Sequence, residues 1–73
     1  MKTYLVVWFS SNGSKPSEVT KHLLGMGFRP IEGAYDFEYQ WDHEADIDEI
    51  LNFGDKILLE LKGSDVMFKL ETF

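Results

Sequence analysis

The sequence contains no cysteine among its 73 residues. A disulfide framework, a thiolate metal site and an iron–sulfur cluster are therefore excluded, and packing alone must stabilise the fold. Long hydrophobic runs are also missing, because the longest apolar stretch, Leu5–Phe9, is far too short to span a bilayer. The first residues lead into a strand pattern without the features of a signal peptide. We expect a cytoplasmic protein that does not enter a membrane.

Positive charge is scarce as well. Seven basic and thirteen acidic side chains give a formal net charge of -6. No basic residue lies between Arg29 and Lys56, an interval that is rich in aspartate and glutamate. Binding to nucleic acid or to anionic lipid requires lysine and arginine to replace counterions, so the charge pattern disfavours both partners.

The composition fits one small globular domain over residues 1–73. A hydrophobic share of 44% and a charged share of 27% are typical of a folded chain and not of a disordered one. A chain of this length buries only about 60% of its unfolded surface. It leaves no room for a separate cofactor domain, and we expect no cofactor.

Hydrophobic periodicity predicts six secondary-structure elements. Strands are expected at Thr3–Phe9, Phe28–Glu32, Tyr35–Trp41 and Val66–Phe73, and helices at Lys15–Met26 and Ile47–Leu61. Asp46 followed by Glu49 is a capping pattern for the second helix. The apolar residues that we expect this helix to turn toward the core are Ile47, Ile50, Leu51, Ile57, Leu58 and Leu61.

Two local features stay open at this point. A two-residue Gly33-Ala34 loop would fit a glycine-first turn between the second and third strands, but it places Ile31 on the same face as Asp36. Gly54, inside the second helix, costs about 1 kcal/mol relative to alanine. Either the helix approaches the bulky aromatics of the third strand closely at this glycine, or it kinks there.

The element order strand, helix, strand, strand, helix, strand predicts an α+β fold of two interleaved right-handed crossover units. The pattern resembles the ferredoxin-like superfold over nearly the whole chain, carried by the segments TYLVVWF, FRPIEGAYDFEYQW and VMFKLETF. The resemblance implies a two-layer sandwich: a four-stranded antiparallel sheet of spatial order 4-1-3-2 with both helices on one face. Pro30 in the second strand suits a sheet edge, where its missing N–H is harmless.

Two narrower resemblances carry no activity. The opening segment YLVVWFSSNGSKPSEVTKHLLGMGFRP is loosely similar to the start of small CRISPR-associated endonucleases of this fold. Those enzymes have a metal-binding aspartate at the end of the first strand, where this chain has Phe9, Ser10 and Ser11. The chain also resembles small uncharacterised archaeal ferredoxin-like proteins, a resemblance that implies fold alone.

Strand alternation predicts which side chains the helices cover and which they leave open. The covered residues are expected to be Leu5, Val7, Phe9, Tyr35, Phe37, Tyr39, Trp41, Val66, Phe68 and Leu70. The open face should carry Tyr4, Val6 and Trp8 at its centre, flanked by Asp36, Glu38 and Gln40 on one side and by Met67, Lys69 and Glu71 on the other. The acids on this face should be solvated and ionised.

The open face is the leading candidate for an interaction surface. An apolar centre with a charged rim is typical of protein association, and the residues concerned are Tyr4, Val6, Trp8, Met67 and Lys69. The alternative is that long side chains such as Lys69 cover this centre with their methylenes. The unprotected last strand offers a second route, since two copies could pair across a two-fold axis. We therefore expect either a protein partner or a homodimer.

The loop between the first strand and the first helix is a candidate site for a small anionic ligand. Its hydroxyls, free amides and one lysine could hold an anion at a helix start; the residues are Ser10, Ser11, Asn12, Gly13, Ser14 and Lys15. It lacks the two spaced glycines of a Walker loop. An ordinary turn uses the same residue types, and this interpretation is favoured.

Metal binding and catalysis find little support. The acidic segment Asp42–Glu49 lacks the turn glycine and the closing glutamate of an EF-hand loop, and its acids suit a helix N-terminus. His22 and His43 have no thiol or third imidazole with which to bind zinc, and His22 should be a half-exposed flank of its helix. No cysteine nucleophile, Ser-His-Asp set or buried carboxylate pair is evident, so a non-enzymatic protein is expected.

Overall fold

Six elements follow one another in the predicted order. The computed structural model describes residues 1–73. Its elements are β1 (Lys2–Trp8), α1 (Pro16–Gly25), β2 (Arg29–Pro30), β3 (Phe37–Gln40), α2 (Ile47–Leu61) and β4 (Met67–Thr72). Strands β2 and β3 are shorter than predicted, because the chain bends between Glu32 and Asp36 instead of continuing in the sheet.

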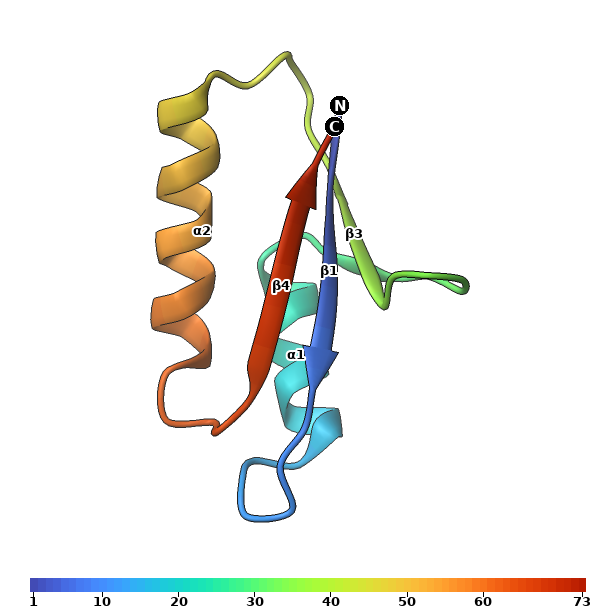
Figure 1. Cartoon of the computed structure of the whole chain (residues 1–73), viewed down its shortest axis with the longest axis vertical. Helices are drawn as coiled ribbons and strands as arrows, with labels where there is room; N and C mark the ends of the chain where they lie inside the picture. Colours follow the sequence, from blue (N-terminus) through green and yellow to red (C-terminus); the bar gives the residue numbers. More distant parts are fainter.

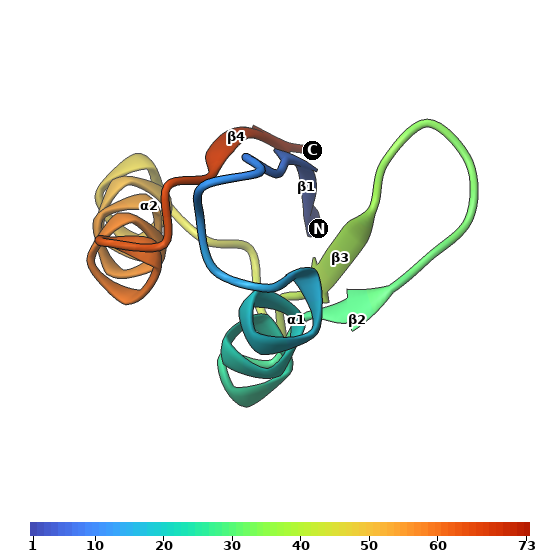
Figure 2. The same cartoon turned by 90° about the horizontal axis from the view of Figure 1, so that it is seen from below.

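The four strands form one antiparallel sheet in the order β2-β3-β1-β4, as predicted for a two-layer α+β sandwich. Figures 1 and 2 show α1 and α2 on the same side of this sheet, with α2 on the β4 side and α1 on the β2 and β3 side. Pro30 lies in the edge strand β2, as expected. No helix combines the length and apolar character that a membrane crossing requires.

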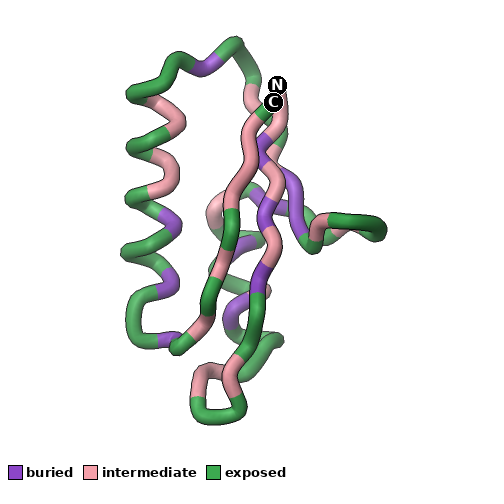
Figure 3. Tube along the Cα trace, viewed as in Figure 1, coloured by how far each residue is buried: buried purple, intermediate pink, exposed green.

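The hydrophobic core lies between β1 and the two helices (Figure 3). Along β1 the odd-numbered residues Thr3, Leu5 and Val7 are buried, whereas the even-numbered ones face the open side. The complete core cluster is small and consists of Leu5, Val7, Val19, Leu23, Phe28, Phe37, Ile57 and Leu61. A core of this size leaves many of the chain's apolar side chains outside.

The α2 start is confirmed, but the explanation of Gly54 is not. The Asp46 carboxylate accepts from the Glu49 amide at 2.8 Å, and the Glu49 side chain accepts from the Asp46 amide at 3.2 Å, which completes the capping box. Helix α2 runs uninterrupted through Gly54. A Cβ at Gly54 would meet only Leu70 of β4, at an ordinary 3.7 Å, so the expected close approach to the aromatics of β3 is wrong.

Two aromatic residues predicted beneath the helices lie elsewhere. Phe9 follows the end of β1 and is 42% exposed. Tyr35 lies outside β3, and its ring stacks on Tyr4 of the open face at a centroid distance of 4.7 Å. The alternation that places Phe37 inward holds only while the chain stays in the sheet, so the bend at Asp36 releases Tyr35 to the opposite side.

Helix α2 also exposes more apolar residues to solvent than the sequence predicts. Of the six residues expected to face the core, Ile57 and Leu61 are buried and Ile50 is half-buried. Ile47, Leu51 and Leu58 are exposed, at 67%, 59% and 59%. The sheet has no further strand beneath this side of α2, because β4 is the edge strand.

The β2–β3 pairing has the register that a two-residue Gly33-Ala34 loop would require, but the chain bends between Glu32 and Asp36 without closing into that tight turn. Arg29 pairs with Glu38, Pro30 pairs with Phe37, and the Ile31 amide donates to the Asp36 carbonyl at 3.0 Å. Gly33 has φ +114°, a conformation that L side chains rarely adopt. Asp36 is exposed, as expected, and its carboxylate also accepts from the Val7 amide at 3.0 Å.

Candidate functional site

The centre of the open sheet face is partly covered by aromatic side chains. Tyr4 lies beneath Tyr35 and also contacts Phe73, whose ring centroid is 5.0 Å away. The Tyr35 hydroxyl donates to the carboxylate of Glu71 on β4. This hydrogen bond raises the pKa of Tyr35 and lowers the pKa of Glu71. The β2–β3 connection is thereby fastened across the open face.

The other residues predicted for the open-face surface differ in how far they are exposed. Trp8 on β1 and Met67 on β4 lie directly opposite each other and are exposed, at 52% and 73%. Val6, which lies between Tyr4 and Trp8 on β1, is half-buried. Lys69, opposite Val6 on β4, makes an ion pair with Glu71 at 3.0 Å. The exposed apolar surface on this face thus consists of a small Trp8–Met67 patch at one end and Phe73 at the other.

Glu38 occupies the open face but is not solvated, contrary to expectation. Its side chain is 7% exposed, and it accepts from the Arg29 Nε at 2.6 Å and from the Lys2 Nζ at 3.3 Å. The hydrogen bond from Arg29 is the largest influence that holds its pKa below the ordinary value of 4.5; burial opposes this effect, and Lys2 adds to it. Glu38 therefore joins the edge strand β2 to β1 through an ionised carboxylate.

A pH dependence of stability follows from this lowered pKa. The ion pairs of Glu38 stabilise the fold fully above pH 4.5, and their contribution is lost as the pH falls through the lower pKa of the folded state. We expect the difference in melting temperature between the native protein and Glu38→Gln to be largest near neutrality and to shrink in acid. Thermal unfolding at a series of pH values measures it. Glu32→Gln, which removes an exposed carboxylate outside any ion pair, is the control, and a difference independent of pH would refute the assignment.

The predicted anion loop uses its amides within the protein. The amide of Asn12 donates to the Ser10 hydroxyl at 3.2 Å, that of Gly13 to the Ser10 carbonyl at 3.1 Å, and that of Ser14 to the Ser64 carbonyl at 3.0 Å. Lys15, the residue before α1, has no capping side-chain bond. These contacts support the turn interpretation, because three of the amides that an anion could use already have acceptors.

The acidic segment before α2 is organised by capping and by one histidine. Beyond the Asp46–Glu49 capping box, His43 contacts the carboxylates of Asp42 and Glu49. The Asp42 hydrogen bond, followed by that of Glu49, raises the pKa of His43. No group of three or more histidine, aspartate or glutamate side chains is arranged to hold a metal ion.

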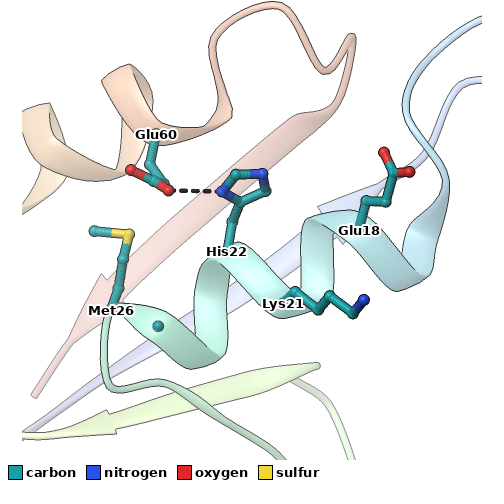
Figure 4. A pocket seen from close by; sticks show the side chains of 6 residues that line it. Glu18, Lys21, His22, Met26 and Glu60 are labelled. Atoms are coloured by element: carbon teal, nitrogen blue, oxygen red, sulfur yellow. Dashed lines mark hydrogen bonds and ion pairs between the residues drawn. The ribbon is translucent and has the colours of Figure 1, made fainter.

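Two clefts border the helices on the side of α1, and neither has a catalytic arrangement. Figure 4 shows the first, of about 440 Å³, in which His22 Nδ1 lies 2.6 Å from a Glu60 carboxylate oxygen while Lys21 extends away from this pair. The second, of about 460 Å³, is lined in part by Tyr39, Trp41 and Phe53, whose rings pack against one another. A nucleophile beside a base is missing from both sets of lining residues.

A third cleft, of about 430 Å³, lies between α2 and β4. It is lined by Thr3, Ile47, Ile50, Leu51, Phe53, Gly54, Asp55, Leu70 and Thr72. The exposed residues Ile47, Leu51 and Leu58 follow one side of α2, the side turned away from α1, because Phe53 and Glu60 on the other side contact Phe28 and His22. We call these three residues and the outer edge of β4 the α2–β4 surface.

The α2–β4 surface is the largest feature that sequence reasoning missed. The sequence predicts the last strand as an open edge, but it places Ile47, Leu51 and Leu58 of the neighbouring helix in the core. The apolar residues of α2, with Phe53 and Leu59 included, extend around more than half of the helix circumference, which is wider than one buried face needs. That width was the available signal.

Comparison with known proteins adds no family to this description. No protein-family model matches the chain, and neither a curated protein nor a solved structure matches it.

Proposed function

We propose that this chain is a non-enzymatic protein-association module that forms a homodimer through the α2–β4 surface. The observation that carries the proposal is the coincidence of two unpartnered features at one place. An edge strand with free backbone groups lies beside a helix side on which Ile47, Leu51 and Leu58 are each more than half exposed. Large apolar side chains gathered beside an open strand edge are typical of an association surface.

This surface supports association better than the open sheet face does. On the open face Tyr4 is already covered by Tyr35 and Phe73, and the exposed apolar side chains Trp8 and Met67 at one end are separated from Phe73 at the other. On the α2–β4 surface a cleft, a row of apolar side chains and a strand edge are continuous. A second copy can satisfy all three at once, because it brings the same helix side and the same edge.

The homodimer is tested with two leucines of the same helix. Leu51→Glu places a charge within the α2–β4 surface and is expected to weaken self-association by a hundredfold or more, on the order of the cost of burying an unpaired charge. Leu59→Glu is the matched control. Leu59 is 69% exposed but points away from the surface, so the same substitution there should leave association unchanged.

Light scattering and sedimentation over a range of protein concentrations measure both variants against the native protein. Circular dichroism confirms that each variant folds, as expected for exposed positions. A native protein that is monomeric at every concentration, or equal effects of the two substitutions, would disprove the proposed function.

A further inference from the structure

We infer that the two copies pair antiparallel along β4 about a two-fold axis at Leu70, so that Lys69 of each copy lies opposite Glu71 of the other. This inference rests on the proposed homodimer and names the residues by which one copy recognises the second. Three features of the chain point to the same register: the phase of the backbone hydrogen bonds, the order of the charges on β4, and the position of Gly54 on α2.

The hydrogen bonds between β1 and β4 decide which groups of β4 are free. The Phe73 amide donates to the Lys2 carbonyl at 3.0 Å, and the Lys2 amide donates to the Phe73 carbonyl at 2.9 Å. Bonded and non-bonded pairs alternate along an antiparallel ladder, so every second residue back from Phe73 also turns its backbone toward β1. The residues between them, Phe68, Leu70 and Thr72, direct their N–H and C=O groups to the free edge.

A second copy of β4 must meet these outward groups with its own. Two-fold pairing at Leu70 does so, because Leu70 then exchanges both bonds with its own counterpart and Phe68 exchanges them with Thr72. A shift of one residue sets outward groups against inward ones and is excluded. Shifts of two residues keep the hydrogen bonds, so the side chains must decide among them.

The charges on β4 separate the remaining registers. A two-residue shift in one direction places Lys69 opposite Lys69 of the other copy, and the opposite shift places Glu71 opposite Glu71. Like charges directly opposite each other are destabilising in a sheet. Pairing at Leu70 instead forms two ion pairs between Lys69 and Glu71. It also brings Met67 opposite Phe73, the side chains of which are 73% and 67% exposed in the single chain.

The position of α2 agrees with an axis at Leu70. Gly54 lies over Leu70, since a Cβ at Gly54 would be 3.7 Å from the Leu70 Cδ1. A two-fold axis midway between the two Leu70 residues therefore passes between the two α2 helices at the level of Gly54. The helices then run antiparallel, and Leu51 of one copy meets Leu58 of the other.

Charge reversal tests the register. Lys69→Glu and Glu71→Lys each turn both ion pairs into repulsions and are expected to weaken the homodimer about ten- to a hundredfold. When the two variants are mixed, every contact again joins opposite charges, so the variants should form a heterodimer with each other. The double variant K69E/E71K should recover the homodimer. Lys21→Glu, the same change of charge on α1, is the control and should leave the dissociation constant unaltered.

Sedimentation velocity gives the dissociation constants, and native mass spectrometry of a mixture with one isotope-labelled variant identifies the heterodimer. Melting temperatures control for folding, because Glu71→Lys also removes the hydrogen bond to Tyr35. A native dimer that survives Lys69→Glu unchanged, or two weakened variants that do not pair with each other, would overturn the register while leaving the homodimer in place. A monomeric native protein would overturn both.

Discussion

Leu5→Ala is expected to lower the free energy of unfolding by about 2–5 kcal/mol, because it removes a fully buried side chain and leaves a cavity. A domain of this length has a total stability on the order of 4–11 kcal/mol. Leu5 lies on the central strand β1 and belongs to a core cluster of only eight residues. One such substitution should therefore bring a large fraction of the molecules close to unfolding.

Chemical denaturation of dilute protein, at a concentration below that of self-association, measures this loss. The matched control is Leu51→Ala, the same chemical change at a side chain that is 59% exposed in the single chain. Its effect on the dilute protein should lie within about 0.5 kcal/mol. If the two substitutions cost the same free energy, the separation into a buried core and an exposed α2–β4 surface is incorrect.

The order and packing of the elements could be predicted from the sequence because several local signals agree. The alternation in β1, Pro30 at an edge strand, the Asp46–Glu49 capping box and the glycine beyond each helix all favour the same topology. Handedness and short connections then leave few ways to arrange two helices and four strands. The predicted strand order and fold class are confirmed on this basis.

Alternation failed where the strand itself stopped. The Tyr35–Trp41 pattern continues in the sequence beyond the residues that the sheet includes, so periodicity placed Tyr35 with Phe37. In the structure Tyr35 has a better partner on the other face, where it stacks on Tyr4 and reaches Glu71. These are contacts between residues far apart in the chain, and no local pattern contains them.

The sequence predicts an interaction surface on the open sheet face, whereas the structure exposes a row of apolar side chains on α2. Sequence periodicity shows that α2 is apolar on one side, but the position of the helix relative to β4 decides how much of that side is covered. Helix α2 lies on the side of the edge strand β4 (Figure 1). Ile57 and Leu61 are buried there, while Ile47, Leu51 and Leu58 remain exposed. The same placement brings Gly54 over Leu70, the residue at which the dimer axis is proposed.

Gly13→Ala separates the structural interpretation of the Ser10–Lys15 loop from the ligand-binding one. A Cβ at Gly13 would overlap the carbonyl oxygen of Ser64, a backbone atom that cannot move without shifting the turn between α2 and β4. The substitution should cost about 1–3 kcal/mol of stability, as overpacking does elsewhere. Ser11→Ala, at an exposed position of the same loop, is the control and should be close to neutral.

Inorganic phosphate distinguishes the two interpretations in the same experiment. A loop that binds an anion gains stability from it by mass action, whereas a loop whose amides are donated to Ser10 and Ser64 gains nothing beyond the general effect of salt. We expect phosphate and an equal ionic strength of chloride to change the melting temperature of the native protein alike. A phosphate-specific rise that Gly13→Ala abolishes would instead establish the loop as a ligand site. A destabilised Gly13→Ala without that rise assigns the glycine to the contact between the β1–α1 loop and the turn that leads into β4, the strand on which self-association is proposed to depend.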